Sequence, residues 1–425
     1  MKPPAVLPAF AGYGIELEYV IVDKATLDPV PIADRFLDAL SARSSQSRNV
    51  GMGWCHELAL HVVEIRNVLP SPVLGQLVTA FQCAIGGADA LLAEFNACLL
   101  PSAMHPWMDP RRETVLWSRT DADIYDTYDR IFDCRQHGWA NIQSMHINLP
   151  FANDAEFTRL HAAVRLTLPL IPALAASSPI AEGRRAAHLD HRLAVYSKNS
   201  KSHPLITGEV IPDTVCTRSQ YEEAVLQPMF NAIAIDDPAG VLRFEWLNSR
   251  GAIARFDRNA IEIRLADTQE CPQADLAVAG AVVYMVRALY DGNWSSLAAQ
   301  QRLSTPRLSK LLNATIRHAE DAVIDDPDYL KLLGVEPGPR RAADVWRSVL
   351  KAASRNRDSD EWLDTAEFIL TRGTLASRIN RALRGNFARE RLRETYSRLC
   401  DCLRYGRLFG LGDTLTLRHD PVVLG

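Results

Sequence analysis

The sequence predicts an α+β fold in which a curved, mainly antiparallel sheet has one open face and helices on the other. Short segments that alternate polar and apolar residues recur in the first half of the chain, separated by longer helical segments. Such alternation is typical of strands packed on one face and solvated on the other. After Gly292 the sequence is helical in character. We therefore predict a sheet domain over residues 1–292 and a helical region packed on it over residues 293–425.

The individual elements follow from periodicity and from helix-start signals. Strands are predicted at residues 15–22, 62–68, 142–149, 240–247 and 261–265. Helices are predicted at residues 73–100, 154–176, 218–232 and 273–290, the last with Pro272 suited to its first turn. The C-terminal helices are predicted at residues 305–318, 342–354, 359–372 and 375–404, with a hinge rich in Asp and Arg at residues 355–360.

Composition limits the class of protein. The chain has 425 residues, 47% of them hydrophobic, which suffices for a large core in one or two domains. Its net charge of −4 leaves no basic surplus for phosphates, so we expect no nucleic-acid partner. Its eight cysteines include no CxxC pair, which favours free thiols in the cytoplasm. The most apolar segment, 74–100, is interrupted by polar residues, so we expect a globular helix and no membrane partner.

Two of the predicted strands carry charged residues on one face. Glu262 and Arg264 lie on the same face of the strand at 261–265, because side chains alternate between faces. Glu16 and Glu18 share a face in the first strand, about 7 Å apart. Like charges at this distance are costly without a positive partner, and a divalent cation is the simplest one. The pattern predicts a metal site on the sheet, whereas a solvated outer face is the ordinary interpretation of any single pair.

Two further segments add groups of the same kind. Residues 54–67 contribute Glu57 and Glu64, which would face opposite ways without a turn between them, and residues 141–149 contribute His146. Carboxylates with one histidine and no thiolate favour Mg²⁺ or Mn²⁺ over zinc. Magnesium held by carboxylates beside arginines is an arrangement that grips a polyphosphate. Because no P-loop and no GxGxxG motif follows a strand, ATP would bind on the sheet face.

Several motifs in a fixed order resemble the carboxylate–amine ligase family related to glutamate–cysteine ligase. They span about residues 12–290 and are GIELEY, HELALHVVEIRN, SAMHPWM, SMHINLPF, AASSPIAEG and AIEIRLADTQ. The resemblance implies a glutamine-synthetase-like fold, whose antiparallel sheet forms a funnel-shaped active site. It also implies an ATP- and Mg²⁺-dependent enzyme. Such an enzyme phosphorylates a substrate carboxylate, typically the γ-carboxylate of glutamate, and an amine then displaces the phosphate.

The resemblance also implies roles for individual residues. It implies metal ligands at Glu16, Glu18, Glu57, Glu64, His146 and Glu262. Arg264 would face the transferred phosphoryl group and act in catalysis with Glu262, and either Arg250 or Arg255 would bind phosphate beside it. Substrate would lie near Asn148, Arg192, Tyr196 and Asn199. Most of these last residues belong to the central segment 188–212, for which a polar surface loop is an equally good interpretation.

Other interpretations stay open at this point. One is a phosphotransferase of the same fold, which would stop at the phosphorylated product. Another is a non-catalytic homologue that binds metal or nucleotide, and a third is an interaction role for the C-terminal helices. The partners that we expect are a small carboxylate, glutamate in the first place, and an amine that the sequence does not identify. We also expect a homo-oligomer, since sheet edges of this fold are suited to pairing.

Overall fold

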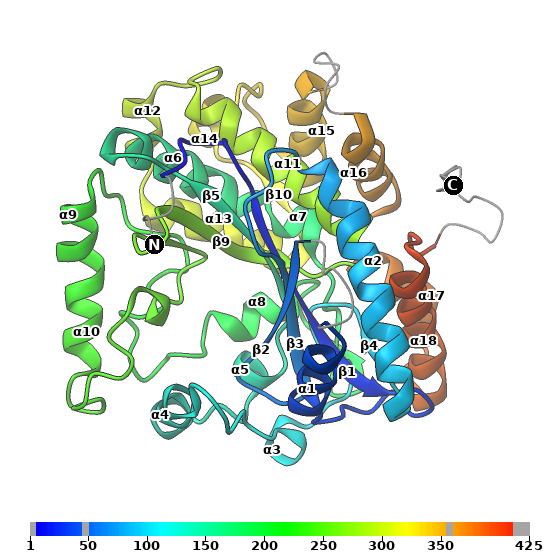
Figure 1. Cartoon of the computed structure of the whole chain (residues 1–425). Coiled ribbons are helices and arrows are strands. Elements are labelled where there is room, and N and C mark those ends of the chain that lie inside the picture. Colours follow the sequence, from blue (N-terminus) through cyan, green and yellow to red (C-terminus); the bar gives the residue numbers. More distant parts are fainter. Residues whose placement is uncertain (1–5, 45–50, 354–359, 411–425) are drawn as a thin grey trace, which may run out of the picture.

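The computed structural model describes residues 6–44, 51–353 and 360–410. At its centre lies a seven-stranded antiparallel sheet with the order β2-β3-β1-β5-β9-β8, in which β4 also pairs with β1 (Figure 1). The strands are β1 (Gly14–Asp23), β2 (Met52–His56), β3 (Val62–Asn67), β4 (Ala97–Leu100), β5 (Ser144–Pro150), β8 (Ala252–Arg255) and β9 (Ala260–Asp267). The predicted α+β fold with a mainly antiparallel sheet is confirmed.

Helices surround this sheet (Figure 1). Those before residue 292 are α1 (Ala33–Ser44), α2 (Gly75–Leu92), α3 (Pro110–Glu113), α4 (Ala122–Phe132), α5 (His137–Ala140), α6 (Asp154–Thr167), α7 (Pro172–Ala175), α8 (His191–Tyr196), α9 (Arg218–Tyr221), α10 (Gln227–Ile233) and α11 (Pro272–Tyr290). Those after it are α12 (Leu297–Gln301), α13 (Thr305–His318), α14 (Pro327–Leu332), α15 (Ala342–Ala353), α16 (Asp360–Arg372), α17 (Leu375–Leu383) and α18 (Arg389–Tyr405). Two small two-stranded sheets pair β6 (Ile180–Ala181) with β7 (Arg184–Arg185) and β10 (Val323–Ile324) with β11 (Arg340–Arg341).

One face of the sheet packs on the helices. Ile15 and Leu17 of β1 are fully buried in the main core, which also contains much of α11. This helix is apolar on nearly every side and is buried along most of its length. Gly280 lets α16 approach closely, because a Cβ there would lie 2.7 Å from the ring of Trp362. The core therefore lies behind the sheet, around α11.

The opposite face of β1 changes character along the strand. Glu16 and Glu18 occupy its first half, whereas Val20 and Val22 occupy the same face further on. The two valines are buried in a second apolar cluster together with Ile379 of α17 and residues of β4 and α18. The C-terminal helices thus cover this face at one end of the sheet and leave its acidic end accessible.

The prediction for the edge of the sheet is wrong. Residues 240–247 form turns and a 3₁₀ turn at Glu245–Leu247, and Gly240 has a φ of 71°, outside the strand region. The edge position beside β9 belongs to β8 instead. The prediction also omits β2 and β4. β4 lies inside the predicted helix 73–100, because α2 ends at Leu92 and Asn96 reverses the chain with a left-handed φ of 55°.

Some predicted helices are interrupted. The segment 154–176 forms α6, a 3₁₀ turn and α7, because Pro169 and Pro172 lack the N–H groups that a continuous helix needs. The segment 375–404 is divided into α17 and α18 at Arg384, which has a φ of 52°. The region after Gly292 also contains the β10–β11 pair. The predicted hinge at 355–360 lies outside the described residues, apart from Asp360.

The helix α2 packs on the main core and also contacts the C-terminal helix α18. By length and composition alone the segment Gly75–Phe95 could cross a membrane, and 33% of its most apolar window is buried. In the fold, Phe81 belongs to the main core, and Gln82 donates a hydrogen bond of 2.9 Å to the Leu403 carbonyl of α18. These contacts are those of a helix packed within a globular fold. The predicted division of the chain at residue 292 stays a prediction.

Candidate active site

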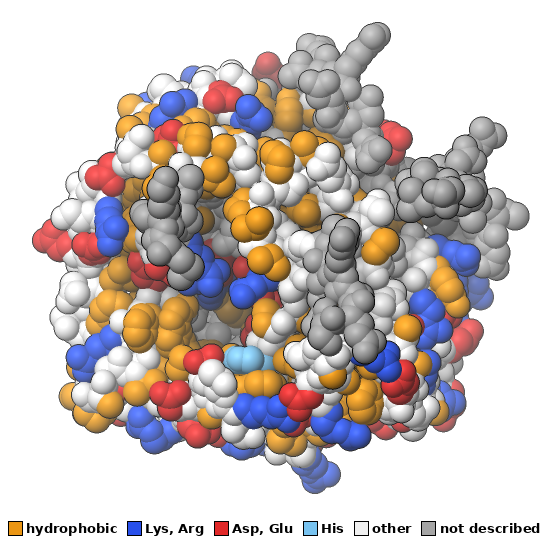
Figure 2. All heavy atoms as spheres, in the orientation of Figure 1, with side chains coloured by type: hydrophobic (Ala, Val, Ile, Leu, Met, Phe, Trp, Pro, Cys, Tyr) orange, Lys and Arg blue, Asp and Glu red, His pale blue; other side chains and the backbone are white. Residues whose placement is uncertain are grey.

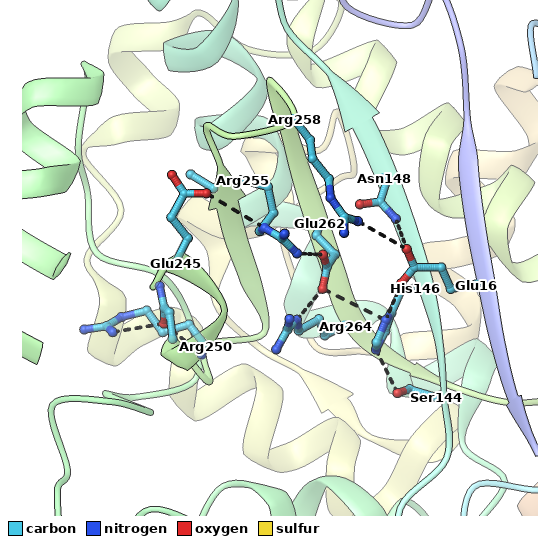
Figure 3. A network of polar contacts seen from close by, with 12 residues as sticks. Glu16, Ser144, His146, Asn148, Glu245, Arg250, Arg255, Arg258, Glu262 and Arg264 are labelled. Carbon is cyan, nitrogen blue, oxygen red and sulfur yellow. Dashed lines mark hydrogen bonds and ion pairs between the residues drawn. The ribbon is translucent and has the colours of Figure 1, made fainter. Parts of the chain in front are cut away.

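Neighbouring strands bring the predicted acidic residues to one area of the open sheet face. In the antiparallel register, Glu16 of β1 lies opposite His146 of β5, and Glu18 of β1 lies opposite Glu64 of β3. Glu262 enters this area from β9, on the other side of β5 (Figure 3). Residues that are distant in the sequence thus meet because alternation places each one on the same face of its strand.

His146 lies at the centre of this group (Figure 3). Its Nδ1 atom is 2.9 Å from a carboxylate oxygen of Glu16 and 4.0 Å from one of Glu262. Its Nε2 atom is 3.7 Å from an oxygen of Glu18. Ser144 contributes a backbone N–H that donates to Glu18 over 2.7 Å, and its Oγ lies 2.9 Å from Nε2 of the histidine. One imidazole therefore bridges three carboxylates that come from two strands.

The carboxylates near β2 and β3 carry an excess of negative charge. Burial, followed by the charge of Glu16, raises the pKa of Glu64 to about 7. Burial, followed by the charges of Glu18 and Glu64, raises the pKa of Glu57 well above its usual value. Glu57 lies at the start of the turn between β2 and β3. This turn brings its side chain to the cavity that Glu64 also lines. A cation placed among these groups would relieve their repulsion.

The charge balance at β9 is the opposite. Burial raises the pKa of Glu262, but the charges of Arg264 and His146 outweigh it and lower the pKa to about 2. Burial lowers the pKa of His146, but its hydrogen bond to Glu16 and the nearby carboxylates raise it to about 9. Glu262 is therefore ionised at neutral pH, and His146 carries a proton as long as no cation replaces it.

Two groups of side chains in this area have the geometry of a cation site. Glu16, His146 and Glu262 form one, and Glu18, Glu64 and His146 form the other, each with ligand atoms within 4.8 Å of one another. Carboxylate oxygens with a single imidazole suit Mg²⁺ or Mn²⁺. The repulsion among neighbouring carboxylates is the second sign, because it adds to burial in raising the pKa values of Glu57 and Glu64. The residues thus fit a divalent cation.

The structure separates the two competing arginines. Arg255 lines the cavity and places Nη1 3.3 Å from Glu262, while Nε of Arg264 donates to the other oxygen of Glu262 over 2.6 Å. Arg250 lies outside the lining and apart from Glu262 (Figure 3), and it is bound by Asp213 at 2.8 Å and by backbone carbonyls. The expectation that Arg250 binds phosphate is therefore not supported, because its guanidinium is engaged elsewhere.

A cavity of about 520 Å³ lies over the acidic group. A hollow containing acidic and basic side chains is visible on the face shown in Figure 2. The predicted site residues that line the cavity are Glu16, Glu18, Glu57, Glu64, His146, Arg192, Tyr196, Asn199, Arg255, Glu262 and Arg264. Asn148 is not in the lining, and its Nδ2 donates to Glu16 over 3.3 Å. Arg192 is held in the wall, since its Nε donates to Asp267 over 2.6 Å and its Nη2 donates to the Arg264 carbonyl over 3.1 Å.

Sequence reasoning missed part of the lining. Tyr125 and Tyr128 of α4 and Trp139 of α5 line the cavity, and no periodicity distinguishes them from core aromatics. Arg66 also lines it, 3.8 Å from Glu64. Strand alternation in the sequence already places Arg66 on the face of Glu64, although the resemblance assigns Arg66 no role.

The fold is that of a glutamate–cysteine ligase. A crystal structure of glutamate–cysteine ligase from Francisella tularensis in complex with AMP matches with a TM-score of 0.59 and 12% identity, over 92% of this chain and 89% of that one. The family model described as glutamate-cysteine ligase family 2 (GCS2) matches residues 13–400. The chain belongs to this family, and the resemblance seen in the sequence is confirmed.

Two relatives are similar to this chain in sequence. An uncharacterized protein from Archaeoglobus fulgidus is 33% identical over 340 residues, which are 76% of this chain and 90% of the relative. A protein from Ectopseudomonas mendocina, provisionally named glutamate–cysteine ligase 2, is 27% identical over 281 residues, which are 64% of this chain and 66% of the relative. The similarity therefore extends well beyond the individual motifs.

Proposed function

We propose that this protein is an ATP-dependent carbon–nitrogen ligase, which joins a small carboxylate, glutamate in the first place, to an amine. The observation that carries the proposal is the group of carboxylates around His146, which shares one cavity with the guanidinium groups of Arg255 and Arg264. Membership of glutamate-cysteine ligase family 2 supports the reaction class. A protein of the same fold that was crystallised with AMP is consistent with a nucleotide in this cavity.

The acidic residues would hold the divalent cations. We assign Mg²⁺ or Mn²⁺ to Glu16, Glu18, Glu57, Glu64, His146 and Glu262. When bound, such cations neutralise phosphate oxygens and orient the acceptor carboxylate. Arg264 is fixed by its hydrogen bond to Glu262, and within the described residues its terminal nitrogens make no further hydrogen bond. These donors would stabilise the charge on the transferring phosphoryl group.

The proposed reaction has two steps. A carboxylate oxygen of the acid substrate attacks the γ-phosphorus of ATP, the bond to the β-phosphate oxygen breaks, and ADP leaves. The deprotonated amine then attacks the carbonyl carbon of the acyl phosphate. The new carbon–nitrogen bond forms as the carbon–oxygen bond to phosphate breaks, and the nitrogen loses a proton. A phosphotransferase of this fold would stop after the first step.

An assay of ADP and phosphate tests the reaction class. The protein is incubated with Mg–ATP, glutamate and a panel of amines, and the products are followed by phosphate release and mass spectrometry. A ligase gives ADP, phosphate and an amide only when an amine is present. ADP with a phosphorylated product and no amide would indicate the phosphotransferase, and failure to bind Mg–ATP with any substrate would indicate a non-catalytic homologue.

Two substitutions test the site. Glu262→Gln and Arg264→Met should each lower phosphate release by roughly a hundredfold or more, because each removes a charge next to the phosphoryl group. Both variants should keep the circular dichroism spectrum of the parent. Glu94→Gln is the matched control, since the Glu94 carboxylate is 57% exposed and lies outside the lining. Full activity in both site variants would show that the site is misassigned.

Cytoplasmic location and homo-oligomer formation belong to the same proposal. Light scattering after size-exclusion chromatography measures the oligomeric state directly. A monomer at micromolar concentration would contradict the expectation of pairing at a sheet edge.

A further inference from the structure

A second cavity lies beside the candidate active site. Its volume is about 960 Å³, against about 520 Å³ for the active-site cavity. Trp139 and Asn199 line both cavities, so the two meet at this wall. The second cavity is otherwise formed by residues around α3, by α5, by the segment after α8, by the β6–β7 turn and by the start of α18. The central polar segment 188–212 therefore lies between the two cavities.

The wall between the cavities is well fixed. Nε1 of Trp139 donates to the Asn199 carbonyl over 3.1 Å, and its ring stacks on Phe132 with centroids 5.4 Å apart. Gly138 allows α5 to approach α8, because a Cβ at this position would lie 2.9 Å from the Val195 carbonyl oxygen. The boundary between the two cavities therefore has a defined position.

The second cavity is basic. Its lining contains Arg111, Arg135, Lys198, Lys201 and Arg389. The arginines already have carboxylate partners from outside the lining, such as Asp133, which is 3.6 Å from Arg111. Lys198 and Lys201, by contrast, form no ion pair with any residue in 6–44, 51–353 or 360–410. The cavity thus offers two lysines whose charge the protein does not balance.

The acidic residues of this lining do not change the balance. Asp109 caps α3 by accepting from the Arg111 N–H and lies 3.5 Å from Arg112. Glu182 is paired with Arg184 at the β6–β7 turn. Both carboxylates are therefore satisfied by groups other than the two lysines. The two exposed lysines are therefore free to contact an anionic group that enters this cavity.

The charged residues of the two cavities indicate which part of the substrates each cavity would bind. The acidic group and Arg264 lie in the first cavity, so the phosphates of the nucleotide belong there. A molecule in the second cavity would place its anionic end at the lysines and its amine beside Trp139 and Asn199, which also line the first cavity. We propose that the second cavity binds the amine substrate through its carboxylates, and that Lys198 and Lys201 select acidic amines. This assignment rests on the proposed ligase function.

A matched pair of dipeptides tests the selection. Glycyl-L-aspartate and glycyl-L-asparagine have the same size and a free amine, and they differ by one negative charge. Calorimetry with the full-length protein, in low salt and without ATP, should show roughly threefold to tenfold tighter binding of glycyl-L-aspartate, the range expected for one or two partly exposed ion pairs. In the phosphate-release assay its KM should be lower by the same factor, at an unchanged kcat.

The lysines provide the variants. Lys198→Met with Lys201→Met should equalise the two dipeptides in calorimetry, while the KM for Mg–ATP stays as in the parent. Lys198 and Lys201 are both exposed to solvent, so the double variant should fold. Lys310→Met is the control, because Lys310 is an exposed residue of α13 that lines neither cavity. This control should keep the preference for glycyl-L-aspartate.

Other outcomes overturn the proposal or separate it from the ligase function. Equal affinity of the parent for both dipeptides overturns it. A raised KM for Mg–ATP in the double variant, with dipeptide binding unchanged, also overturns it and assigns the cavity to the nucleotide. If the parent binds glycyl-L-aspartate in a lysine-dependent way but turns over no ATP with any amine, the ligase function fails, whereas the recognition of acidic amines stands.

Discussion

The ion pair between Glu270 and Arg378 allows a quantitative test of how the C-terminal region is attached. Glu270 follows β9, and its two carboxylate oxygens accept from Nη1 and, over 3.2 Å, from Nη2 of Arg378 in α17. The side chains are 0% and 3% exposed. The guanidinium also donates to the Gly373 carbonyl over 3.1 Å and to the Phe409 carbonyl over 2.8 Å. This buried pair therefore joins the strand of the site to the last described residues.

Glu270→Gln keeps the shape of the side chain and removes its charge. An unpaired guanidinium is then left in a buried position, which typically costs about 3–5 kcal/mol. Some donor contacts survive with the amide oxygen, so we expect a loss near the lower end, about 3 kcal/mol of the free energy of unfolding. Urea denaturation, followed by tryptophan fluorescence and by circular dichroism, measures this loss when the two transitions coincide.

Asp321→Asn is the matched control for this measurement. Its carboxylate is 3.1 Å from Arg341, but the side chains of Asp321 and Arg341 are 64% and 51% exposed. Exposed pairs contribute about 0–1 kcal/mol, so the control should differ little from the parent. If Glu270→Gln loses no more stability than this control, the reasoning from burial is refuted. Adding Arg378→Met to Glu270→Gln should recover part of the loss, because no buried charge remains.

Three further predictions concern the site and the core. Mn²⁺ binding at pH 8 should release protons, because the pKa of His146 is about 9 and a ligating imidazole must be neutral. Affinity should rise up to pH 9. Calorimetry in two buffers counts the protons, and His146→Asn should lower the count by about one. Gly280→Ala should cost about 1–3 kcal/mol in urea denaturation by crowding Trp362. Arg255→Lys should lower phosphate release about tenfold, whereas Arg250→Lys, outside the cavity, should not; equal effects would contradict the separation of the two arginines.

The sequence correctly predicts those features of the site that depend on the alternation of side chains between the two faces of a strand. The sequence predicts Glu16 and Glu18 on one face of a strand, and Glu262 and Arg264 on one face of another, and the structure shows each pair on the open face of the sheet. This works because the direction of a side chain in a strand depends only on neighbouring residues. The same rule misleads at 240–247, where turns also alternate in polarity.

What the sequence does not predict depends on contacts between distant segments. The choice between Arg250 and Arg255 follows from the pairing of β8 with β9, since only Arg255 lies within that pairing, opposite Ala260. The second cavity gathers Lys198 and Arg389 from opposite halves of the chain, and neither belongs to a recognisable motif. Breaks within helices were missed where a single residue, such as Arg384, takes a left-handed conformation that its type rarely adopts.

The division of β1 into an acidic and an apolar half has a consequence for biosynthesis. Val20 and Val22 are synthesised long before their covering partner Ile379. Until then the far half of the strand exposes apolar surface to other nascent segments. Closing so long a loop is also slow, since folding rates fall as contacts become more distant in sequence. We therefore expect the apolar half of the strand to reach its final position only after synthesis of the C-terminal helices.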